Sequence, residues 1–177
     1  MIQLTPLAES DHPHFAKELF ESAFPEEERP PFGEIKKRNK EQFHFQVATL
    51  EEDDEPIGIL TYWTFEDFIY VEHFAIDEEM RNRGLGRLVF LTFLSQQNQQ
   101  VVFEVEMPTT ELAARRIDFY KRMGLIRNTQ EYWQPSYNKK EHKLAMQLII
   151  MSKYELDDDE FLEIQQVLYK NVYHYEL

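Results

Sequence analysis

The chain has 177 residues, and its 14 Phe, 9 Tyr and 2 Trp within a 42% hydrophobic content predict one substantial core and a single domain. Its 33 acidic and 19 basic residues give a formal net charge of -14, which opposes binding to the phosphate backbone, so we expect no nucleic acid as a partner. It contains no cysteine, which excludes disulfides, thiolate metal sites and cysteine nucleophiles.

Hydrophobic periodicity predicts short strands and helices in the first half of the chain. In chain order we expect a strand at residues 2–6, a helix that follows Ser10 or Asp11 and ends near Pro25, a helix at residues 32–40, and strands at residues 43–50, 57–65 and 68–76. Ser10 and Asp11 are candidate helix caps. The three consecutive strands favour antiparallel neighbours.

A glycine-bearing loop and an apolar helix open the second half of the chain. The expected elements are this helix at residues 87–97, a strand at 101–105, a helix from Thr109 or Thr110 to Gly124, strands near Tyr132 and at 144–151, and a helix from Asp159 with Phe161, Ile164, Leu168 and Val172 on one face. This order predicts an α+β fold, with a mixed, mostly antiparallel sheet and flanking helices.

The chain contains no run of about 18 apolar residues, and Met1-Ile2-Gln3-Leu4 lacks the basic and then apolar pattern of a secretory signal. We therefore expect a cytoplasmic protein with no membrane partner. Acidic runs at residues 26–28, 51–55 and 157–160 predict solvated loops and helix starts, and an acidic rim that attracts a cationic substrate is the alternative.

The loop between the strand at 68–76 and the following helix has the composition of a phosphate-binding loop. Gly84 and Gly86 would let a pyrophosphate approach backbone N–H groups at the helix N-terminus. Positive charge is concentrated beside them at Arg81, Arg83 and Arg87. A Walker loop would need Gly-Lys-Ser or Gly-Lys-Thr at its end, and a dinucleotide fingerprint would need glycine where Val89 stands, so neither motif applies.

The pattern Arg81-x-x-Gly84-x-Gly86 resembles the acetyl-coenzyme A signature of the GNAT family, the Gcn5-related N-acetyltransferases. Residues 74–77 before it resemble the apolar strand end of the family, and residues 119–125 after it resemble the family's tyrosine-containing helix end. The resemblance implies a GNAT-like acyl-CoA N-acyltransferase domain at residues 1–152. A C-terminal helical extension at residues 153–177 is expected to pack on the same domain.

The resemblance also implies that acetyl-CoA is the acyl donor. The residues that it assigns to cofactor binding are Phe74, Ala75, Ile76, Arg81, Asn82, Arg83, Gly84, Leu85, Gly86 and Arg87. Many family members carry Asn where this chain has Ala113, and Arg115 and Arg116 are the substitutes considered for that contact. His12 and His14 form the only close histidine pair and lack partner ligands, so we expect no metal.

Three groups are needed for direct acetyl transfer, and the resemblance assigns two of them. Tyr120 matches the tyrosine whose hydroxyl can protonate the leaving thiolate, and a backbone N–H near Ile76 is expected to stabilise the oxyanion. The base is left open between Glu72, Glu104 and Glu106.

The period-two rule places Glu72 on one strand face with Phe74 and Ile76, beside the apolar cofactor face that would raise its pKa. The same rule places His73, as a structural residue, on the opposite face. The stretch from Tyr132 to Pro135, with Tyr137, is expected to lie near the acceptor substrate.

The predicted function is N-acetyl transfer from acetyl-CoA to a primary amine of a small molecule or peptide, and the acidic balance favours a cationic one. The alternative is a non-catalytic acyl-CoA-binding sensor or interaction domain. The protein is expected to be a monomer or a homodimer, because the apolar stripe of the last helix suits either docking on its own sheet or dimerisation.

Overall fold

The computed structural model describes residues 1–42, 44–138 and 140–176. Its mostly antiparallel strands and flanking helices confirm the predicted α+β class. The chain forms two compact units, Met1–Val101 and Val102–Leu177. The domain boundary expected between residues 152 and 153 falls inside the second unit and stays a prediction.

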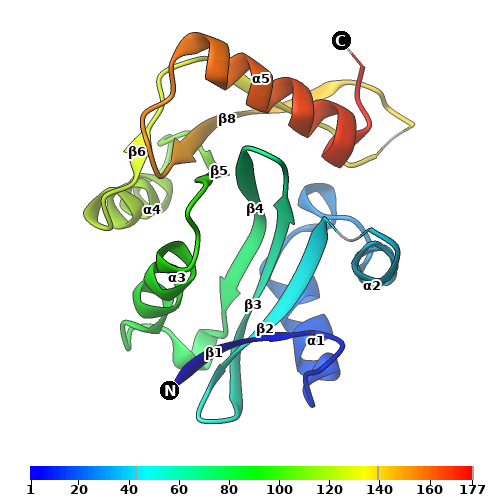
Figure 1. Ribbon diagram of the computed structural model, residues 1–177, viewed down its shortest axis with the longest axis vertical. Helices are drawn as coiled ribbons and strands as arrows, with labels where there is room; N and C mark the ends of the chain where they lie inside the picture. The colour runs from blue at the N-terminus through cyan, green and yellow to red at the C-terminus, as the bar shows by residue number, and fades with distance from the viewer. Residues whose placement is uncertain (43, 139, 177) are drawn as a thin grey trace. The chain divides into compact units, whose positions relative to one another are not determined.

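In the first unit, the described residues form four strands and three α-helices. Its elements are β1 (Ile2–Pro6), α1 (Pro13–Ala23), the 3-10 turn η1 (Glu26–Glu28), α2 (Phe32–Glu41), β2 (Phe45–Glu52), β3 (Glu55–Thr64), β4 (Phe68–Ile76), the 3-10 turn η2 (Glu78–Met80) and α3 (Leu85–Ser95). The strands pair antiparallel in chain order, as expected for consecutive strands. Helices α1 and α2 lie on one side of these strands and α3 lies on the other (Figure 1).

Two helix starts in this unit differ from the sequence prediction. The N-cap of α1 is His12, and Ser10 instead accepts a hydrogen bond of 3.1 Å from the His12 backbone N–H. Helix α3 begins at Leu85, two residues before the predicted start, because Gly84 takes a left-handed conformation and its carbonyl accepts the first helical hydrogen bond, from Leu88. The strand predicted from residue 43 begins at Phe45, and Phe43 itself lies outside the described residues.

Strand β4 contains a bulge beside its partner β3. Thr61 is paired with His73, but the next residue, Tyr62, is paired with Val71, so Glu72 is an extra residue on β4. A bulge interrupts the alternation of side chains across a strand. The face occupied by Glu72 therefore does not predict, by the period-two rule, the face occupied by the residues that follow it on the strand.

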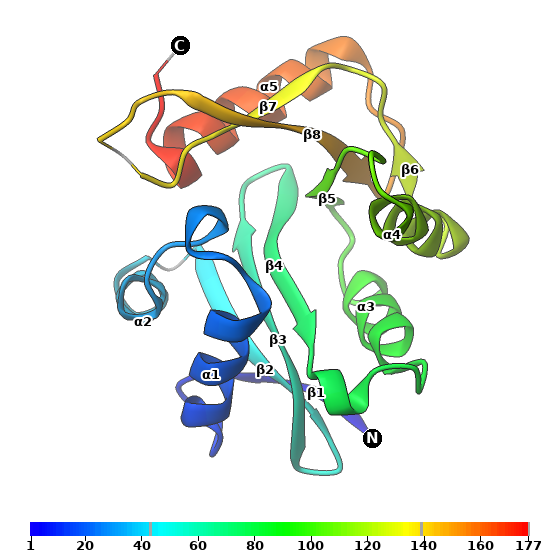
Figure 2. The ribbon, with the colours of Figure 1, turned by 180° about the vertical axis from the view of Figure 1, so that it is seen from behind.

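The second unit is built around one long strand, β8. Its elements are β5 (Gln100–Glu106), whose first residues lie at the unit boundary, α4 (Glu111–Arg122), β6 (Ile126–Arg127), β7 (Tyr132–Pro135), β8 (Leu144–Ser152), α5 (Asp158–Leu168) and the π-helix η3 (Tyr169–Tyr173). Strand β8 pairs antiparallel with β5 on one edge and with β6 and β7 on the other. Helix α5 runs beside β7 and β8 (Figure 2).

The helix ends of this unit follow their sequence signals closely. The Thr110 side chain caps α4 by accepting from the Ala113 N–H at 3.1 Å, and Gly124 follows this helix with a φ of 87°. Asp157 and Glu160 form a capping box at the start of α5, one residue earlier than expected. The predicted stripe Phe161, Ile164, Leu168 and Val172 is buried. The short strand β6 and the π-helix were not predicted.

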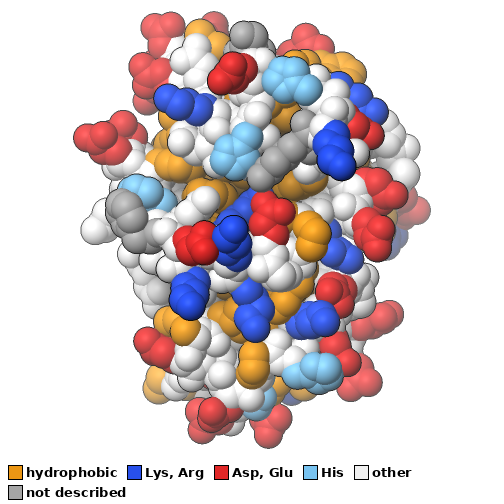
Figure 3. Space-filling model, turned by 90° about the vertical axis from the view of Figure 1, so that its right-hand side faces the viewer, with side chains coloured by type: hydrophobic (Ala, Val, Ile, Leu, Met, Phe, Trp, Pro, Cys, Tyr) orange, Lys and Arg blue, Asp and Glu red, His pale blue; other side chains and the backbone are white. Residues whose placement is uncertain are grey.

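The surface does not present a uniform charge. On the face seen in Figure 3, Lys and Arg side chains are interspersed with Asp and Glu. Across the described ranges, no helix combines the length and the apolar character that crossing a membrane requires.

Candidate functional site

The loop from β4 to α3 ends in an open helix N-terminus. Asn82 and Gly84 both have positive φ angles, of 63° and 75°, which turn the chain sharply into α3. A Cβ atom built on Gly84 would meet no atom within 4 Å, so there is open space beside this residue at the start of the helix. The first N–H groups of an α-helix have no partner within the helix and attract anions.

The arginines of this loop are exposed to solvent. Arg81 donates a hydrogen bond of 3.1 Å to the Ile76 carbonyl, which ties the loop to the end of β4. Arg83 lies 3.9 Å from the Glu52 carboxylate with its side chain 55% exposed, a weak pair that a stronger anion can displace. Arg87 is exposed on the first turn of α3. The charge at this helix N-terminus is therefore available to a bound phosphate.

The end of β4 is packed tightly from one side and only half-buried itself. The Phe74 ring lies 5.1 Å from the Phe90 ring of α3. On β3, a Cβ atom added to Gly58 would lie 2.5 Å from the Ala75 carbonyl oxygen. Gly58 thus permits a close approach of the two strands, which holds the backbone at residues 74–76 in place.

The first unit brings all ten predicted cofactor residues together on one strand end, loop and helix start. The open space at Gly84, the unpaired helix N-terminus and the exposed arginines fit the pyrophosphate of a coenzyme A thioester. The individual cofactor contacts stay predictions.

Glu72 occupies a different environment from the one predicted. Its side chain is 0% exposed, it accepts a hydrogen bond of 2.7 Å from the Trp63 indole, and it lies 3.5 Å from Arg38 of α2. Phe74, in contrast, packs on α3. The prediction that these two residues share a strand face is wrong, because the bulge at Glu72 breaks the alternation.

His73 is a buried structural residue, as expected, but it lies on the same side of β4 as Glu72. Its ring packs edge-on against Phe20 and Phe24 of the α1 segment. Its Nδ1 atom lies 3.0 Å from the Thr61 hydroxyl. Burial lowers the pKa of His73, with the nearby Glu72 charge acting in the opposite direction. The histidine therefore favours the neutral form in the folded protein.

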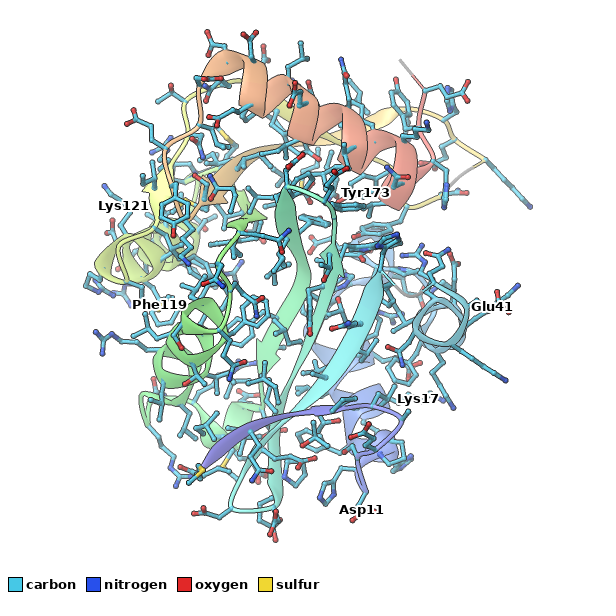
Figure 4. The ribbon with its side chains drawn as sticks, viewed as in Figure 1. Asp11, Lys17, Glu41, Phe119, Lys121 and Tyr173 are labelled. Atoms are coloured by element: carbon cyan, nitrogen blue, oxygen red, sulfur yellow. The ribbon has the colours of Figure 1, made fainter. Side chains whose placement is uncertain are left out.

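Tyr120 lies on α4 in the second unit. Its neighbours in the sequence, Phe119 and Lys121, are labelled in Figure 4. Its ring packs on Phe103 of β5 at 4.5 Å. Burial raises the pKa of Tyr120 to about 12, against a smaller lowering effect of Arg116. The hydroxyl consequently keeps its proton at neutral pH and is able to donate a hydrogen bond.

Three further predicted positions on α4, Ala113, Arg115 and Arg116, have local contacts. Ala113 is buried, and its backbone N–H is used by the helix cap. Arg115 pairs with Glu111 at 2.5 Å. Arg116 lies 3.4 Å from Glu106, the third candidate base, and both side chains are about half exposed, at 45% and 47%.

Glu104 is surrounded by donors within the second unit. Tyr132 donates to Oε1, while Gln134 and Tyr173 donate to Oε2 at 2.5 Å and 2.8 Å. Tyr132 and Gln134 are two residues apart on β7, so the period-two rule indicates that they share a face. Tyr173 comes from the C-terminal π-helix, and no local pattern in the sequence indicates its contact with Glu104.

Among the described residues, no group of three or more His, Asp or Glu side chains is arranged to hold a metal ion. The absence of a metal requirement stays a prediction.

Residues 12–125 match the profile of the acetyltransferase (GNAT) family. A GNAT-family protein from Bacteroides thetaiotaomicron is 32% identical in sequence and superimposes with a TM-score of 0.90 over 99% of both chains. Comparison with curated proteins gave no match.

Two other solved structures are similar in fold alone. The ribosomal-protein-S18-alanine N-acetyltransferase from Escherichia coli is 14% identical, with a TM-score of 0.56 over 90% of this chain and 98% of that chain. Arabidopsis thaliana Naa50, in complex with the bisubstrate analogue CoA-Ac-MVNAL, is 15% identical, with a TM-score of 0.60 over 87% of this chain and 99% of that chain. The predicted GNAT-like fold is thereby confirmed.

Proposed function

Since the chain belongs to the GNAT acetyltransferase family, we propose that it transfers the acetyl group of acetyl-CoA directly to a primary amine of a small molecule or peptide. The observation that carries the proposal is the open N-terminus of α3, where Gly84 leaves space and Arg81, Arg83 and Arg87 are exposed. The acidic balance of the chain favours a cationic acceptor, because charge complementarity speeds the encounter. Cytoplasmic location and a monomeric or homodimeric state stay predictions.

Acetyl-CoA supplies an acetyl thioester when bound. In this proposal the backbone N–H groups of residues 84–86 and the loop arginines hold its phosphates. The half-buried backbone of residues 74–76 binds the pantetheine arm, and a backbone N–H near Ile76 stabilises the oxyanion. Gly58 supports this role, since the close contact with Ala75 restricts movement of the strand end.

Tyr120 assists the departure of the thiolate in this proposal. A pKa of about 12 lies above that of a thiol, which is roughly 8.5, so complete proton transfer from Tyr120 is unfavourable by on the order of 5 kcal/mol. Hydrogen-bond donation does not carry that cost. We therefore assign Tyr120 as a hydrogen-bond donor to the leaving sulfur, with solvent as the final proton source.

Glu104 is the preferred base among the three predicted carboxylates. Glu72 is fully buried and engaged by Trp63 and Arg38, which supports a structural role. Glu106 forms a solvent-exposed ion pair with Arg116, which leaves the position of its carboxylate weakly restrained. Glu104 is partly exposed and held by side chains from two further elements, an arrangement suited to accepting a proton from the substrate ammonium group, directly or through water, so that the neutral amine can attack the thioester.

The first test is calorimetric titration of acetyl-CoA into the wild type, Gly86→Trp and Gly33→Trp. Gly86 and Gly33 are each the second residue of their helix, α3 and α2, so the same indole is placed at equivalent helix positions. We expect micromolar binding that Gly86→Trp abolishes and Gly33→Trp preserves. No binding to the wild type, or equal loss in both variants, would contradict the cofactor site.

The second test measures release of free coenzyme A with a panel of amines, including peptide N-termini, lysine, polyamines and aminoglycosides. Release that depends on one class of amine supports the proposed reaction and identifies the acceptor. Tight binding of acetyl-CoA without release from any amine would favour the non-catalytic acyl-CoA-binding alternative.

A further inference from the structure

The C-terminal segment after α5 reaches the Glu104 carboxylate through one hydroxyl group. Tyr173 donates to Glu104 Oε2 at 2.8 Å and accepts from Gln134 Nε2 at 3.0 Å, so the three side chains form a closed triangle. Tyr173 is 3% exposed and lies 69 residues beyond Glu104 in the sequence. It also lies outside residues 12–125, the part that matches the family profile. The contact is thus made by a segment beyond the matched region.

A second tyrosine fastens the same segment to β7. The Tyr169 hydroxyl donates to the Trp133 backbone carbonyl and accepts from Gln165 Nε2 at 3.2 Å. Tyr169 and Tyr173 are both buried and are the first and last residues of the π-helix. Turns of π-helix are rare and occur frequently at functional sites. Anchored in this way, Tyr173 is held beside Glu104 by the backbone of the neighbouring strand.

The Tyr132 hydroxyl is the third donor to the Glu104 carboxylate, and it stays protonated. Burial, followed by the charge of Glu104 and the hydrogen bond to it, raises the pKa of Tyr132 well above its ordinary value. Two hydroxyl donors and one amide donor therefore converge on Glu104. Such charge-assisted hydrogen bonds restrict both the rotamer and the position of a carboxylate. A base that accepts a substrate proton needs that restriction, since displacement by about 1 Å can cost roughly a hundredfold in rate.

We infer that Tyr173 is a positioning residue for acetyl transfer, which holds the Glu104 carboxylate in the orientation needed to accept the amine proton. Residues 169–173 then belong to the catalytic apparatus of this chain, and α5 serves to place them. The inference rests on the proposed function, in which Glu104 is the base.

The first experiment observes the carboxylate itself and needs no acceptor substrate. The Glu104 side-chain carboxyl carbon is followed by NMR as a function of pH in ¹³C-labelled wild type, with its signal assigned by its loss in Glu104→Gln. Tyr173→Phe removes one donor without changing the ring. We expect the midpoint of the Glu104 titration to rise by about one pH unit, because the charged form loses a hydrogen bond. An unchanged midpoint would overturn the inference.

Tyr175→Phe is the matched control. It removes a hydroxyl from the same segment, and its ring contacts are with Tyr169 and His142. Within the described part of the chain, its hydroxyl is not one of the three Glu104 donors. We expect the Glu104 midpoint to stay unchanged in this variant, and a shift equal to that of Tyr173→Phe would indicate a general loosening of the segment.

The second experiment uses the amine identified by the panel. Tyr173→Phe should lower kcat about tenfold, leave KM for acetyl-CoA unchanged, and move the acid limb of the kcat/KM profile to higher pH. Thermal melting of each variant separates this effect from a loss of folded protein.

The outcomes distinguish the inference from the proposed function. If Glu104→Gln is inactive while Tyr173→Phe matches the wild type, only the positioning role is overturned. Full kcat in Glu104→Gln overturns the base assignment together with the positioning role. A wild type that releases no coenzyme A with any amine overturns the proposed function and the positioning role with it, and the NMR titration then reports only on the contact of Tyr173 with Glu104.

Discussion

The Trp63 indole Nε1 donates a hydrogen bond of 2.7 Å to the carboxylate of Glu72, whose side chain is completely shielded from solvent. Arg38 of α2 lies 3.5 Å from the same carboxylate and 2.8 Å from Glu34. The Arg38 guanidinium also lies over the Trp63 ring, 5.8 Å from its centroid. Glu72 thus connects α2 to two strands of the first unit, and its replacement should affect the fold before it affects chemistry.

Glu72→Gln is expected to lower the free energy of unfolding by about 3 kcal/mol, because Arg38 keeps a buried charge after losing one of its carboxylate partners. Urea denaturation at neutral pH measures this change. Glu66→Gln, at an exposed position between β3 and β4, is the control and should stay within about 0.5 kcal/mol of the wild type. Unchanged stability of Glu72→Gln with a large fall in kcat would instead support Glu72 as the base.

Gly58→Ala is expected to destabilise the first unit by about 2 kcal/mol. The added Cβ would lie 2.5 Å from the Ala75 carbonyl oxygen and 2.9 Å from side-chain atoms of Ile76 and Leu50, so the backbone must move. Affinity for acetyl-CoA should weaken as well, since residues 74–76 are displaced. The control is Gly33→Ala, which has open space in α2 and should raise stability by up to about 1 kcal/mol. Wild-type stability and affinity in Gly58→Ala would contradict the role given to this close contact.

Tyr120→Phe is expected to lower kcat by about tenfold to a hundredfold, with little change in KM, because it removes a hydrogen bond to a developing charge. The wild-type rate should show no alkaline limb near pH 10, where an ordinary tyrosine ionises, because the pKa of Tyr120 is about 12. Steady-state kinetics across pH checks both statements. Tyr154→Phe, at a tyrosine that is 52% exposed, should behave as the wild type. An alkaline limb near pH 10 that disappears in Tyr120→Phe would argue for an unshifted, fully ionising tyrosine.

His73 should make the protein less stable in mild acid. Its pKa is lower in the folded state than the ordinary value of about 6.5 in the unfolded chain, so between these two values the unfolded state binds more protons. The contribution of neutral His73 to the free energy of unfolding is therefore fully present above about pH 6.5. It decreases as the pH falls below this value, with a slope of at most about 1.4 kcal/mol per pH unit.

Denaturant unfolding at a series of pH values, with the wild type and His73→Asn compared, measures this contribution. We expect a shallower pH dependence in the variant at mildly acidic pH. His14→Asn replaces an exposed histidine, with a side chain 83% exposed, and should keep the wild-type slope. Parallel curves for the wild type and His73→Asn would show that His73 is not responsible.

Local sequence signals were sufficient for most elements and for the loop at residues 81–87. Helix α4 and the strands of the first unit follow from short-range periodicity, from caps such as Thr110 and from the glycine after the helix. The loop at residues 81–87 is readable because its chemistry is contiguous. Glycines, arginines and a helix start occur together, and nothing distant is needed to form the helix N-terminus.

The environments of the acidic candidates depended on tertiary structure. The prediction placed Glu72 on the wrong face because the pairing of β3 with β4 produces a bulge. The period-two rule assumes strict alternation and does not account for an extra residue. The contact between Glu104 and Tyr173 joins residues 69 positions apart, and it exists because the buried stripe of α5 docks within the second unit. The sequence alone thus determined the family, most of the elements and the position of the glycine- and arginine-rich loop, since these are encoded by neighbouring residues. Only the folded chain decided which carboxylate is buried in the scaffold and which is held by the C-terminal tyrosine, since side-chain environment is a property of long-range packing.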